Sequence, residues 1–306
     1  MSFSITILGC GSAVPLIHRR PTAQFIEIEQ RTILMDCGEG TQIQLRKFGV
    51  RFQNLDVICI SHLHGDHYLG LPGLLQTLHL LGREKKLAII GPPELEKMLA
   101  MHLSMGGSTL RYEIEFTATQ AGNKQLVWED KLIEVYSFPL KHKIPTTGFL
   151  FQEKEKPRKL LGDKVNFYGV PHYLRNEIKL GADFQTENGE LIPNSKLTTN
   201  PPPSYSYAFC SDTAYFPELV DFLPQGINLL YHEGSFLEQD LDKAKQTQHS
   251  TAQEAGKMAK LLGVDKLVIG HFSARYKDLE PFQKEAEIHF NNVVLAKDGL
   301  VILPTE

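Results

Sequence analysis

The stretch His62-Leu63-His64-Gly65-Asp66-His67 places three imidazoles and one carboxylate within six residues. Ordinary surface or core histidines do not explain this density, whereas imidazole with carboxylate is the ligand chemistry of zinc and similar divalent ions. The motif offers more ligands than one four-coordinate zinc with an open position uses. It therefore predicts two adjacent metal ions.

The segments around this motif predict a loop between a strand and a helix. The apolar, β-branched run Leu55–Ile60 is typical of a buried strand. Leucines recur near helical spacing over Leu69–Gly82, with Pro72 suited to the first turn and the final glycine suited to the end. Because histidines two residues apart do not share a helical face, a loop has to bring the first two histidines of the motif to one centre.

Composition limits the class of protein. With 306 residues and 42% hydrophobic content, the chain can bury a large core. A formal net charge of −4 excludes a globally basic nucleic-acid binder and leaves only local basic patches for that role. The four cysteines form no CxxC pair, which favours reduced thiols. The N-terminus does not resemble a signal peptide and no apolar run is long enough to span a bilayer, so we expect a cytoplasmic protein.

Strand-like and helix-like segments alternate, which predicts an α/β fold with helices covering the faces of sheets. The expected strands are 4–8, 24–29, 32–35, 55–60, 87–90, 112–116, 131–138, 148–151, 205–210, 228–231 and 266–269. Helices are expected within 38–49, over 69–82, over about 94–104, and after a capping box formed by Thr251 and Glu254.

The composition changes between Gln152 and Ser204. This stretch holds the charged run Glu153–Lys159, few apolar periods, and three prolines at Pro201–Pro203. We predict a single domain over residues 1–306 from which residues 152–204 are inserted as a flexible arm. A solvated connector is the alternative interpretation.

Three further ligand candidates each follow a strand-like run, namely His142, Asp212 and His271. The ends of strands are where α/β proteins collect functional side chains. A single histidine after a strand is more often structural, so each residue alone carries little weight. Together with the His62–His67 motif, they provide enough ligands for two metal ions.

An HxHxDH motif followed by histidine, aspartate and histidine resembles the metallo-β-lactamase superfamily. This resemblance implies a four-layer αβ/βα sandwich. It also implies a ligand set for two zinc ions per chain, with Asp212 as the bridge: His62, His64 and His142 for one ion, and Asp66, His67 and His271 for the other. Asp36 matches a further element of the superfamily and is implied to accept the outer N–H of a metal-bound histidine.

Further motifs narrow the resemblance to the ribonuclease Z family, which processes the 3′ ends of tRNA. Leu8–Pro15 is similar to the family's LGTGSAVP, with Cys10 in place of threonine. The other matching stretches are Asp36–Gln42 (DCGEGTQ), Gly91–Pro93, His232–Ser235, His249–Thr251 and His271–Tyr276, and Leu295–Gly299 resembles the family's closing strand. The likeness spans nearly the whole chain.

The chemistry of a phosphodiester suggests roles for several residues. Paired metals stabilise the charge that develops on the attacking and departing oxygens. The resemblance implies that Asp66 accepts a proton from the attacking water. His249 is the candidate donor of a proton to the leaving 3′-oxygen, and Glu233 is the candidate to orient it. Ser273 and Arg275 are candidates to hold a phosphate.

Two alternatives remain open for the proposed acid and its partner. His249 lies two residues before the capping Thr251, so it is also a candidate to cap the helix. Glu233 is also a candidate to pair with His232 in the core.

These patterns together predict a homodimeric, zinc-dependent endoribonuclease that removes 3′ trailers from precursor tRNA and leaves a 3′-hydroxyl. In the family, an inserted arm grips the tRNA from the partner subunit. The family's GPLYG-like sequence is absent, and Gly169–Asn176 occupies its place. The arm's candidates for phosphate contacts are Lys154, Lys156, Arg158, Lys159 and Arg175.

Two other functions compete with this prediction. One is a hydrolase of the superfamily that acts on a lactam, a thioester or a small phosphodiester. The other is a metal-stabilised, non-catalytic RNA-binding scaffold. The His249–Thr251 and His271–Tyr276 motifs favour the nuclease, because a small-substrate hydrolase needs neither a distal acid nor a phosphate clamp. The complete set of ligands disfavours the scaffold.

Overall fold

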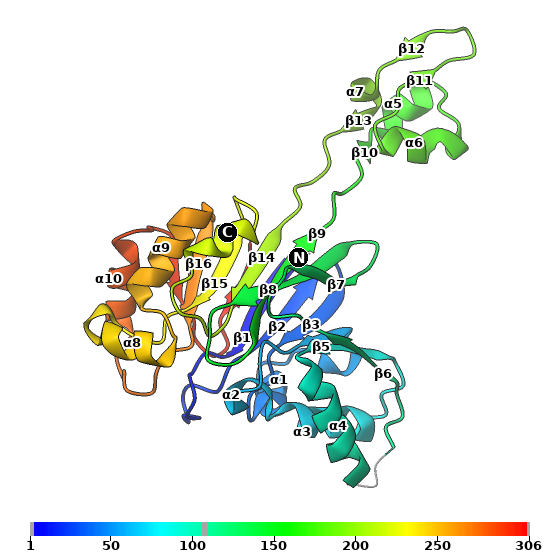
Figure 1. The fold of residues 1–306 in the computed structure, drawn as a ribbon. Coiled ribbons are helices and arrows are strands. Elements are labelled where there is room, and N and C mark those ends of the chain that lie inside the picture. Colours follow the sequence, from blue (N-terminus) through cyan, green and yellow to red (C-terminus); the bar gives the residue numbers. More distant parts are fainter. Residues whose placement is uncertain (1–2, 106–108, 305–306) are drawn as a thin grey trace. The chain divides into compact units, whose positions relative to one another are not determined.

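The computed structural model describes residues 3–105 and 109–304. These residues form two compact units. One combines the chain up to Gln152 with the chain from Tyr205 onward, and the other is Glu153–Ser204. Figure 1 shows the elements of both units, coloured along the chain.

The first sheet of the larger unit has seven strands: β1 (Phe3–Gly9), β2 (Ala23–Ile28), β3 (Arg31–Met35), β4 (Val57–Cys59), β5 (Leu87–Gly91), β6 (Ile114–Ala118) and β18 (Val301–Ile302). Their order in the sheet is β18-β1-β2-β3-β4-β5-β6. Strands β3 to β6 are parallel, whereas β18, β1, β2 and β3 pair antiparallel.

The second sheet also has seven strands: β7 (Gln125–Glu129), β8 (Ile133–Leu140), β9 (Thr146–Glu153), β14 (Ser206–Cys210), β15 (Leu229–Glu233), β16 (Lys266–Gly270) and β17 (Val293–Leu295). Their order is β17-β16-β15-β14-β9-β8-β7. Strands β14 to β17 are parallel, and β14 pairs antiparallel with β9.

The central strands of the first sheet are buried on both faces, and successive side chains of a strand point to opposite faces. In β3, Ile33 and Met35 belong to the same apolar cluster as Phe149 and Phe209 of the second sheet. Leu34 between them packs instead in a second cluster, with the leucines of a covering helix. Strands buried on both sides appear as continuous apolar runs, which is why they could be predicted from the sequence.

Helices cover the outer face of each sheet (Figure 1). Those of the first sheet are α1 (Thr41–Lys47), α2 (Gly65–Tyr68), α3 (Leu71–Leu80) and α4 (Pro93–Met105). Those of the second are α8 (Leu241–Thr247), α9 (Ala252–Leu262) and α10 (Glu280–Glu287), and short 3-10 turns lie at Phe52–Asn54, Pro217–Asp221 and Glu238–Asp240. The predicted capping box opens α9: Glu254 N donates to Thr251 Oγ1 at 3.2 Å, and Thr251 N donates to Glu254 Oε2 at 3.0 Å. The predicted α/β fold and four-layer sandwich are confirmed.

Several boundaries differ from the prediction. Strand β8 begins at Ile133 rather than at residue 131, because Asp130 Oδ1 accepts the backbone N–H groups of Leu132 and Ile133 and forms a turn there. It continues through Pro139, which lies beyond the pairing with β7, since that pairing ends at Ser137. The expected closing strand over Leu295–Gly299 is wrong: β17 ends at Leu295, and a turn leads to β18. Strand β7 and helices α8 and α10 were not predicted.

The smaller unit, Glu153–Ser204, has its own elements: β10 (Lys159–Leu160), α5 (Gly162–Phe167), a 3-10 turn (His172–Leu174), α6 (Arg175–Lys179), β11 (Phe184–Gln185), β12 (Leu191–Ile192), α7 (Asn194–Leu197) and β13 (Thr198–Thr199). Its small apolar core includes Val165, Ile178 and Leu197. Asn194 Nδ2 donates to the carbonyls of Ile178 and Ala182, both at 2.7 Å. The segment is a small folded unit rather than a plain connector.

Candidate metal centre and active site

The fold gathers ligand-type side chains at one edge of the two sheets. Asp36 directly follows β3, and Asp212 and His271 follow β14 and β16 within two residues. His62 comes shortly after β4, and His142 shortly after β8. The carboxyl ends of neighbouring strands meet at the same edge of a sheet, which is where α/β proteins build their sites. The HLHGDH motif lies on a strand-to-helix loop as predicted, and its last two ligand candidates lie in the short helix α2.

One group of ligand atoms comes from His62, His64, His142 and Asp212, and these atoms lie within 4.8 Å of one another. His64 Nδ1 is 3.1 Å from His62 Nε2 and 3.2 Å from His142 Nε2. Three imidazole nitrogens from two distant parts of the chain therefore converge on one point.

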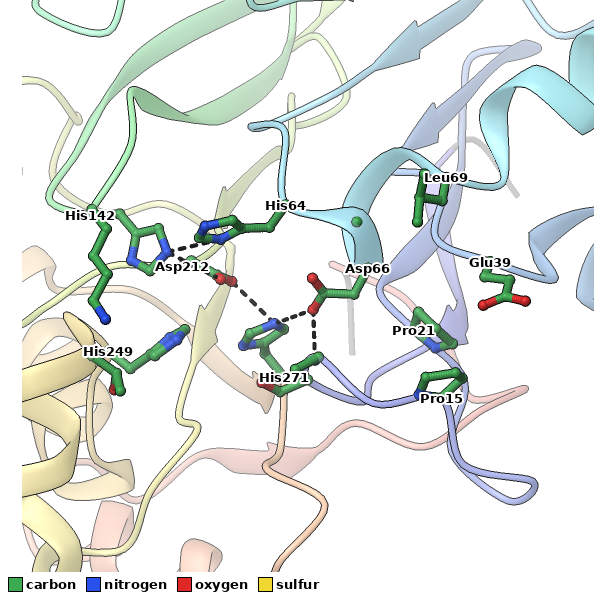
Figure 2. A pocket seen from close by; sticks show the side chains of 15 residues that line it. Pro15, Pro21, Glu39, His64, Asp66, Leu69, His142, Asp212, His249 and His271 are labelled. Carbon is green, nitrogen blue, oxygen red and sulfur yellow. Dashed lines mark hydrogen bonds and ion pairs between the residues drawn. The ribbon is translucent and has the colours of Figure 1, made fainter.

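A second group comes from Asp66, His67 and His271. Asp66 Oδ2 is 3.5 Å from His67 Nε2 and 3.4 Å from His271 Nε2. Figure 2 shows Asp66 and His271 facing each other, with His64 and His142 on the other side of Asp212.

Asp212 lies between the two groups and directs one oxygen to each. Its Oδ2 is 3.5 Å from His62 Nε2 and 3.6 Å from His142 Nε2. Its Oδ1 is 3.3 Å from His67 Nε2 and 3.1 Å from His271 Nε2. This is the geometry of a carboxylate that can bridge two cations.

The hydrogen bonds of two histidines in the cluster are compatible with bound cations. His142 Nδ1 lies 2.8 Å from the carbonyl of Gln248, which accepts only from an N–H, so the inward Nε2 of the neutral ring is unprotonated. The buried Nε2 of His67 forms no hydrogen bond of good geometry within the described residues, although Asp212 Oδ1 lies 3.3 Å away. Unpaired buried nitrogens are rare unless they bind an ion or water. The residues present thus fit metal ions in both groups.

The charges in the cluster also favour the binding of metal ions. Burial raises the pKa of Asp66, but His67 and His271 lower this pKa by more than burial raises it. The pKa therefore lies well below the usual range, and the carboxyl is ionised at neutral pH. Burial also raises the pKa of Asp212, and His271, His67 and His62 outweigh this effect. Burial together with the neighbouring His67 lowers the pKa of His62 to about 3, so this ring is neutral and available as a ligand at pH 7.

Residues outside the ligand groups hold the ligands in place. Asp36 Oδ2 is 2.7 Å from His67 Nδ1, and Asp36 also accepts the backbone N–H and the hydroxyl of Ser61 at 2.8 and 2.9 Å. On the other side of the cluster, Ala13 N donates to Asp66 Oδ2 at 2.7 Å. Asp36 and His271 have positive φ angles of 55° and 60°, a conformation that costs energy in residues other than glycine. Such strain is typical of residues whose orientation matters.

His249 and Glu233 form a pair beside the ligand groups. His249 Nδ1 is 2.7 Å from Glu233 Oε1. Burial lowers the pKa of His249, but the adjacent Glu233 carboxylate raises it to about 9, so the imidazole is protonated at neutral pH. Ser235 N and Oγ donate to the other Glu233 oxygen at 2.9 and 2.8 Å, so the carboxylate cannot turn away.

This pair decides between the alternatives left open by the sequence. The Glu233 carboxylate contacts His249, whereas the His232 ring contacts the backbone carbonyl of Glu233 at 2.6 Å. The cap of α9 is Thr251. The ring of His249 is therefore held by a carboxylate rather than used as a helix cap.

A cavity of about 470 Å³ opens over the cluster (Figure 2). Its lining includes Asp66, His142, Asp212 and His249, and also Lys143, which the sequence analysis missed. The only signal for Lys143 was its place directly after a ligand histidine.

The two residues predicted to hold a phosphate, Ser273 and Arg275, do not line this cavity. Arg275 Nε donates to Ser273 Oγ at 3.2 Å, its guanidinium lies over the ring of Phe236, and Nη1 is 3.6 Å from Asp240. These contacts direct Arg275 to its own loop rather than to the cluster.

Most of the arm's predicted phosphate-binding residues have contacts within their own unit. Lys156 Nζ is 2.9 Å from Glu153 Oε2, Arg158 Nε donates to Thr198 Oγ1 at 2.7 Å, and Arg175 Nη2 donates to Asn166 Oδ1 at 3.2 Å. Lys154 also has an interaction partner. Lys159 lies in β10 and is exposed.

Sequence comparisons connect the chain to known proteins. A family model described as "Anti-Pycsar protein Apyc1" matches residues 3–293. A protein of Parabacteroides distasonis named Ribonuclease Z is 46% identical over 298 residues, covering 97% of this chain and 98% of that protein. The Ribonuclease Z of Bacteroides fragilis (strain YCH46) is 46% identical over 300 residues, covering 98% of each chain.

Solved structures show the same fold. Human tRNase Z, short form (ELAC1), matches with a TM-score of 0.70 at 27% identity and covers 98% of each chain. The metallo-β-lactamase fold protein YhfI from Bacillus subtilis matches with a TM-score of 0.68 at 18% identity, also over 98% of each chain, which shows the fold alone. The chain is a member of the group that the Apyc1 model describes, and its identity to full-length relatives shows that it belongs to the ribonuclease Z family of the metallo-β-lactamase fold.

Proposed function

We propose that this protein is an endoribonuclease that removes 3′ trailers from precursor tRNA and leaves a 3′-hydroxyl on the tRNA. The observation that supports this function most strongly is the convergence of all seven ligand candidates in a chain that matches Ribonuclease Z proteins over nearly its full length. A scaffold has no need for this arrangement.

We further propose that two zinc ions per chain occupy the cluster. His62, His64 and His142 would hold one, Asp66, His67 and His271 the other, and Asp212 would bridge them. Imidazole and carboxylate donors suit zinc. Bound there, the ions would offset the charge of a phosphate and lower the pKa of an attacking water.

The protein's own groups would supply the proton transfers. Asp66, which accepts a hydrogen bond from Ala13 N at 2.7 Å, would accept a proton from the attacking water. His249, protonated at neutral pH, would donate one to the leaving 3′-oxygen. Glu233 keeps that proton on His249 and holds the ring in position.

Lys143 supplies a positive charge to the cavity, so it is expected to contact a phosphate of the RNA. Replacing Lys143 with glutamine should weaken binding of the precursor and reduce the slope of log K against log salt concentration by about 0.7–0.9. Lys141→Gln is the matched control, because Lys141 is also exposed but does not line the cavity. Binding measured at several salt concentrations tests this, and equal slopes for both variants would contradict a phosphate contact by Lys143.

The unit Glu153–Ser204 is proposed to bind the body of the tRNA through its basic residues. Deleting residues 153–204 is feasible because Gln152 pairs with Ser206 in the sheet, so a short linker can join the ends. The deletion should raise KM for precursor tRNA far more than it slows hydrolysis of a small chromogenic phosphodiester. Steady-state kinetics on both substrates test this, and equal losses would reject a role limited to recognition.

Two further properties remain proposals. We propose a homodimer, to which the exposed apolar side chains Ile43 of α1, Leu80 of α3 and Met101 of α4 contribute a surface. We also propose a cytoplasmic location, because all four cysteines are free and buried, which suits a reducing compartment. Among the described residues no helix is long and apolar enough to cross a membrane.

Incubation of the purified protein with a 3′-extended tRNA transcript, with and without a chelator, tests the function. We expect one metal-dependent cut at the 3′ end of the tRNA, leaving a 3′-hydroxyl and a trailer with a 5′-phosphate. A protein that cleaves a small phosphodiester but leaves this RNA intact would instead be a small-substrate hydrolase of the same fold.

A further inference from the structure

The cavity over the cluster has two chemically different ends (Figure 2). His142 and His249 lie at one end and Lys143 also belongs to the lining, which provides donors and positive charge suited to a phosphate. Beyond Asp66, at the other end, lie Pro15, Pro21, Glu39 and Leu69. We call these last four residues the base pocket.

We propose that the base pocket binds the nucleobase of the first trailer nucleotide and favours guanine there. This inference rests on the proposed function. It adds a determinant of substrate choice that the metal cluster itself does not supply.

The walls of the base pocket suit the flat face of a base. Two proline rings and the side chain of Leu69 line it, and Leu69 is 55% exposed although it borders a polar site. Apolar surface left open beside a reaction centre is typical of a ligand contact. A base that covers these groups removes apolar area from water on both sides.

Glu39 indicates that a base, and not a phosphate, occupies this end. It is exposed, and among the described residues it forms no hydrogen bond or ion pair. A carboxylate next to an RNA phosphate is repelled. Next to a base edge it can accept hydrogen bonds from ring N–H and amino groups.

The shape of a carboxylate favours one base over the others. Guanine presents N1–H and N2–H side by side, which matches the two oxygens of Glu39. Adenine and cytosine each present one amino group, and uracil presents a single N–H between two carbonyls that repel a carboxylate. Two parallel hydrogen bonds to a charged group exceed one in strength and geometric selectivity.

The backbone next to Glu39 is held in place. Gly38 N donates to the carbonyl of Thr22 at 3.1 Å, and Thr41 Oγ1 donates to the carbonyl of Gly38 at 2.7 Å. A Cβ at Gly38 would meet the carbonyl oxygen of Asp66 and lie 2.6 Å from Pro21 Cβ, so only glycine lets this turn approach the ligand helix and the pocket wall. The backbone that carries Glu39 is therefore fixed at the pocket wall before RNA binds.

The direction of the RNA follows from the position of the proposed acid. His249 donates to the leaving 3′-oxygen, which belongs to the tRNA, so the end of the tRNA lies on the His249 side of the cavity. The trailer keeps the phosphate and continues past Asp66 toward the base pocket. This assigns the pocket to the first trailer nucleotide.

Competition between two transcripts of one tRNA tests the inference. They carry guanosine or uridine as the first trailer nucleotide and are cut in the same tube, so the ratio of their kcat/KM values does not depend on the fraction of active enzyme. The wild-type protein should prefer guanosine by about tenfold. Glu39→Gln should bring the ratio within about twofold of equality, because an amide offers one acceptor and opposes the second donor.

Two controls separate this effect from a general one. Glu94→Gln removes an exposed carboxylate on α4, outside the cavity, and should keep the wild-type ratio. A second pair of transcripts differs only in the base on the tRNA side of the cut. The ratio of their kcat/KM values should be the same for the wild-type protein and for Glu39→Gln. Leu69→Ala should raise KM for both transcripts alike, since an apolar wall does not distinguish bases.

The outcomes distinguish the two claims. Loss of guanosine preference in Glu39→Gln alone supports the base pocket. Cleavage with equal rates for both trailers in the wild-type protein, or a preference that Glu39→Gln leaves unchanged, overturns the base pocket and leaves the nuclease intact. If no 3′-extended tRNA is cut at all, the proposed function is wrong and the base pocket is rejected with it.

Discussion

Replacing His249 with alanine is expected to lower kcat for precursor tRNA by about 100- to 10,000-fold while the bound metal stays unchanged. This is the usual range for the loss of a positioned general acid. The side chain pairs with Glu233 at 2.7 Å and lines the cavity over the ligand groups, so its removal deprives the leaving oxygen of its proton donor. Single-turnover cleavage with metal analysis on the same sample measures both quantities.

The proposed role of His249 also predicts how kcat changes with pH. Glu233 overcomes the effect of burial and raises the pKa of His249 to about 9, so the proton is present below that pH and is lost above it. The wild-type kcat should therefore fall as the pH rises through this region. Glu233→Gln should move the fall to lower pH, because the neutral amide no longer stabilises the imidazolium.

The control for these experiments is His102→Ala, which removes an exposed histidine on α4 and should change neither kcat nor its pH profile. Turnover of His249→Ala close to that of the wild type would remove His249 from the mechanism. Loss of zinc together with activity would instead make His249 part of the metal site, as its place in a third group with Asp212 and His271 permits.

Replacing Asp212 with alanine is expected to have the largest effect on metal binding. Its two oxygens face different ligand groups, Oδ2 at 3.5 Å from His62 and Oδ1 at 3.1 Å from His271. Without it, each group loses a ligand, and the negative charge that lies between the two groups is removed. We expect no more than one tightly bound ion per chain and a loss of activity above about 100-fold, since even outer partners of ligands account for 10–100-fold.

Asp36→Asn provides a graded comparison. Asp36 contacts His67 from outside the cluster, and asparagine keeps its size. This variant should weaken metal binding by about 10- to 100-fold yet still hold two ions at saturating zinc. Two tightly bound ions in Asp212→Ala, measured by titration against a competing chelator, would show that Asp212 is not a bridge.

Several ligand candidates could be predicted from the sequence because they follow strands that are buried on both faces, as His62 follows β4 and His271 follows β16. Ile33 and Leu34 face different apolar clusters, so β3 appears as a continuous apolar run that ends just before Asp36. The motif at His62–His67 supplied the anchor, and the topology brought Asp212 and His271 to the same edge.

Other features depend on contacts between distant residues and could not be predicted. The Glu233 carboxylate faces His249 rather than His232 because the backbone N–H groups of Thr213 and Ser235 hold it in that position. The contact of Ala13 N with Asp66 joins residues 53 positions apart. The contacts of Arg275 with Ser273 and Asp240 could likewise not be predicted from the motif that suggested a phosphate-binding role for it.

The small unit Glu153–Ser204 escaped prediction for a different reason. Its helices have only four to six residues, too short to show a clear helical period. Its core depends on single side chains from several turns, such as Val165 and Ile192, and on the amide of Asn194. Composition alone therefore indicated a charged, proline-containing insertion without indicating that it folds.

Metal analysis of the pure, active protein tests the central claim most directly. We predict two zinc ions per chain, removed by a chelator together with tRNA cleavage, and a crystal structure with anomalous signal at two positions flanking Asp212. Full cleavage activity in protein without stoichiometric metal, or metal bound away from His62, His142 and His271, would contradict it.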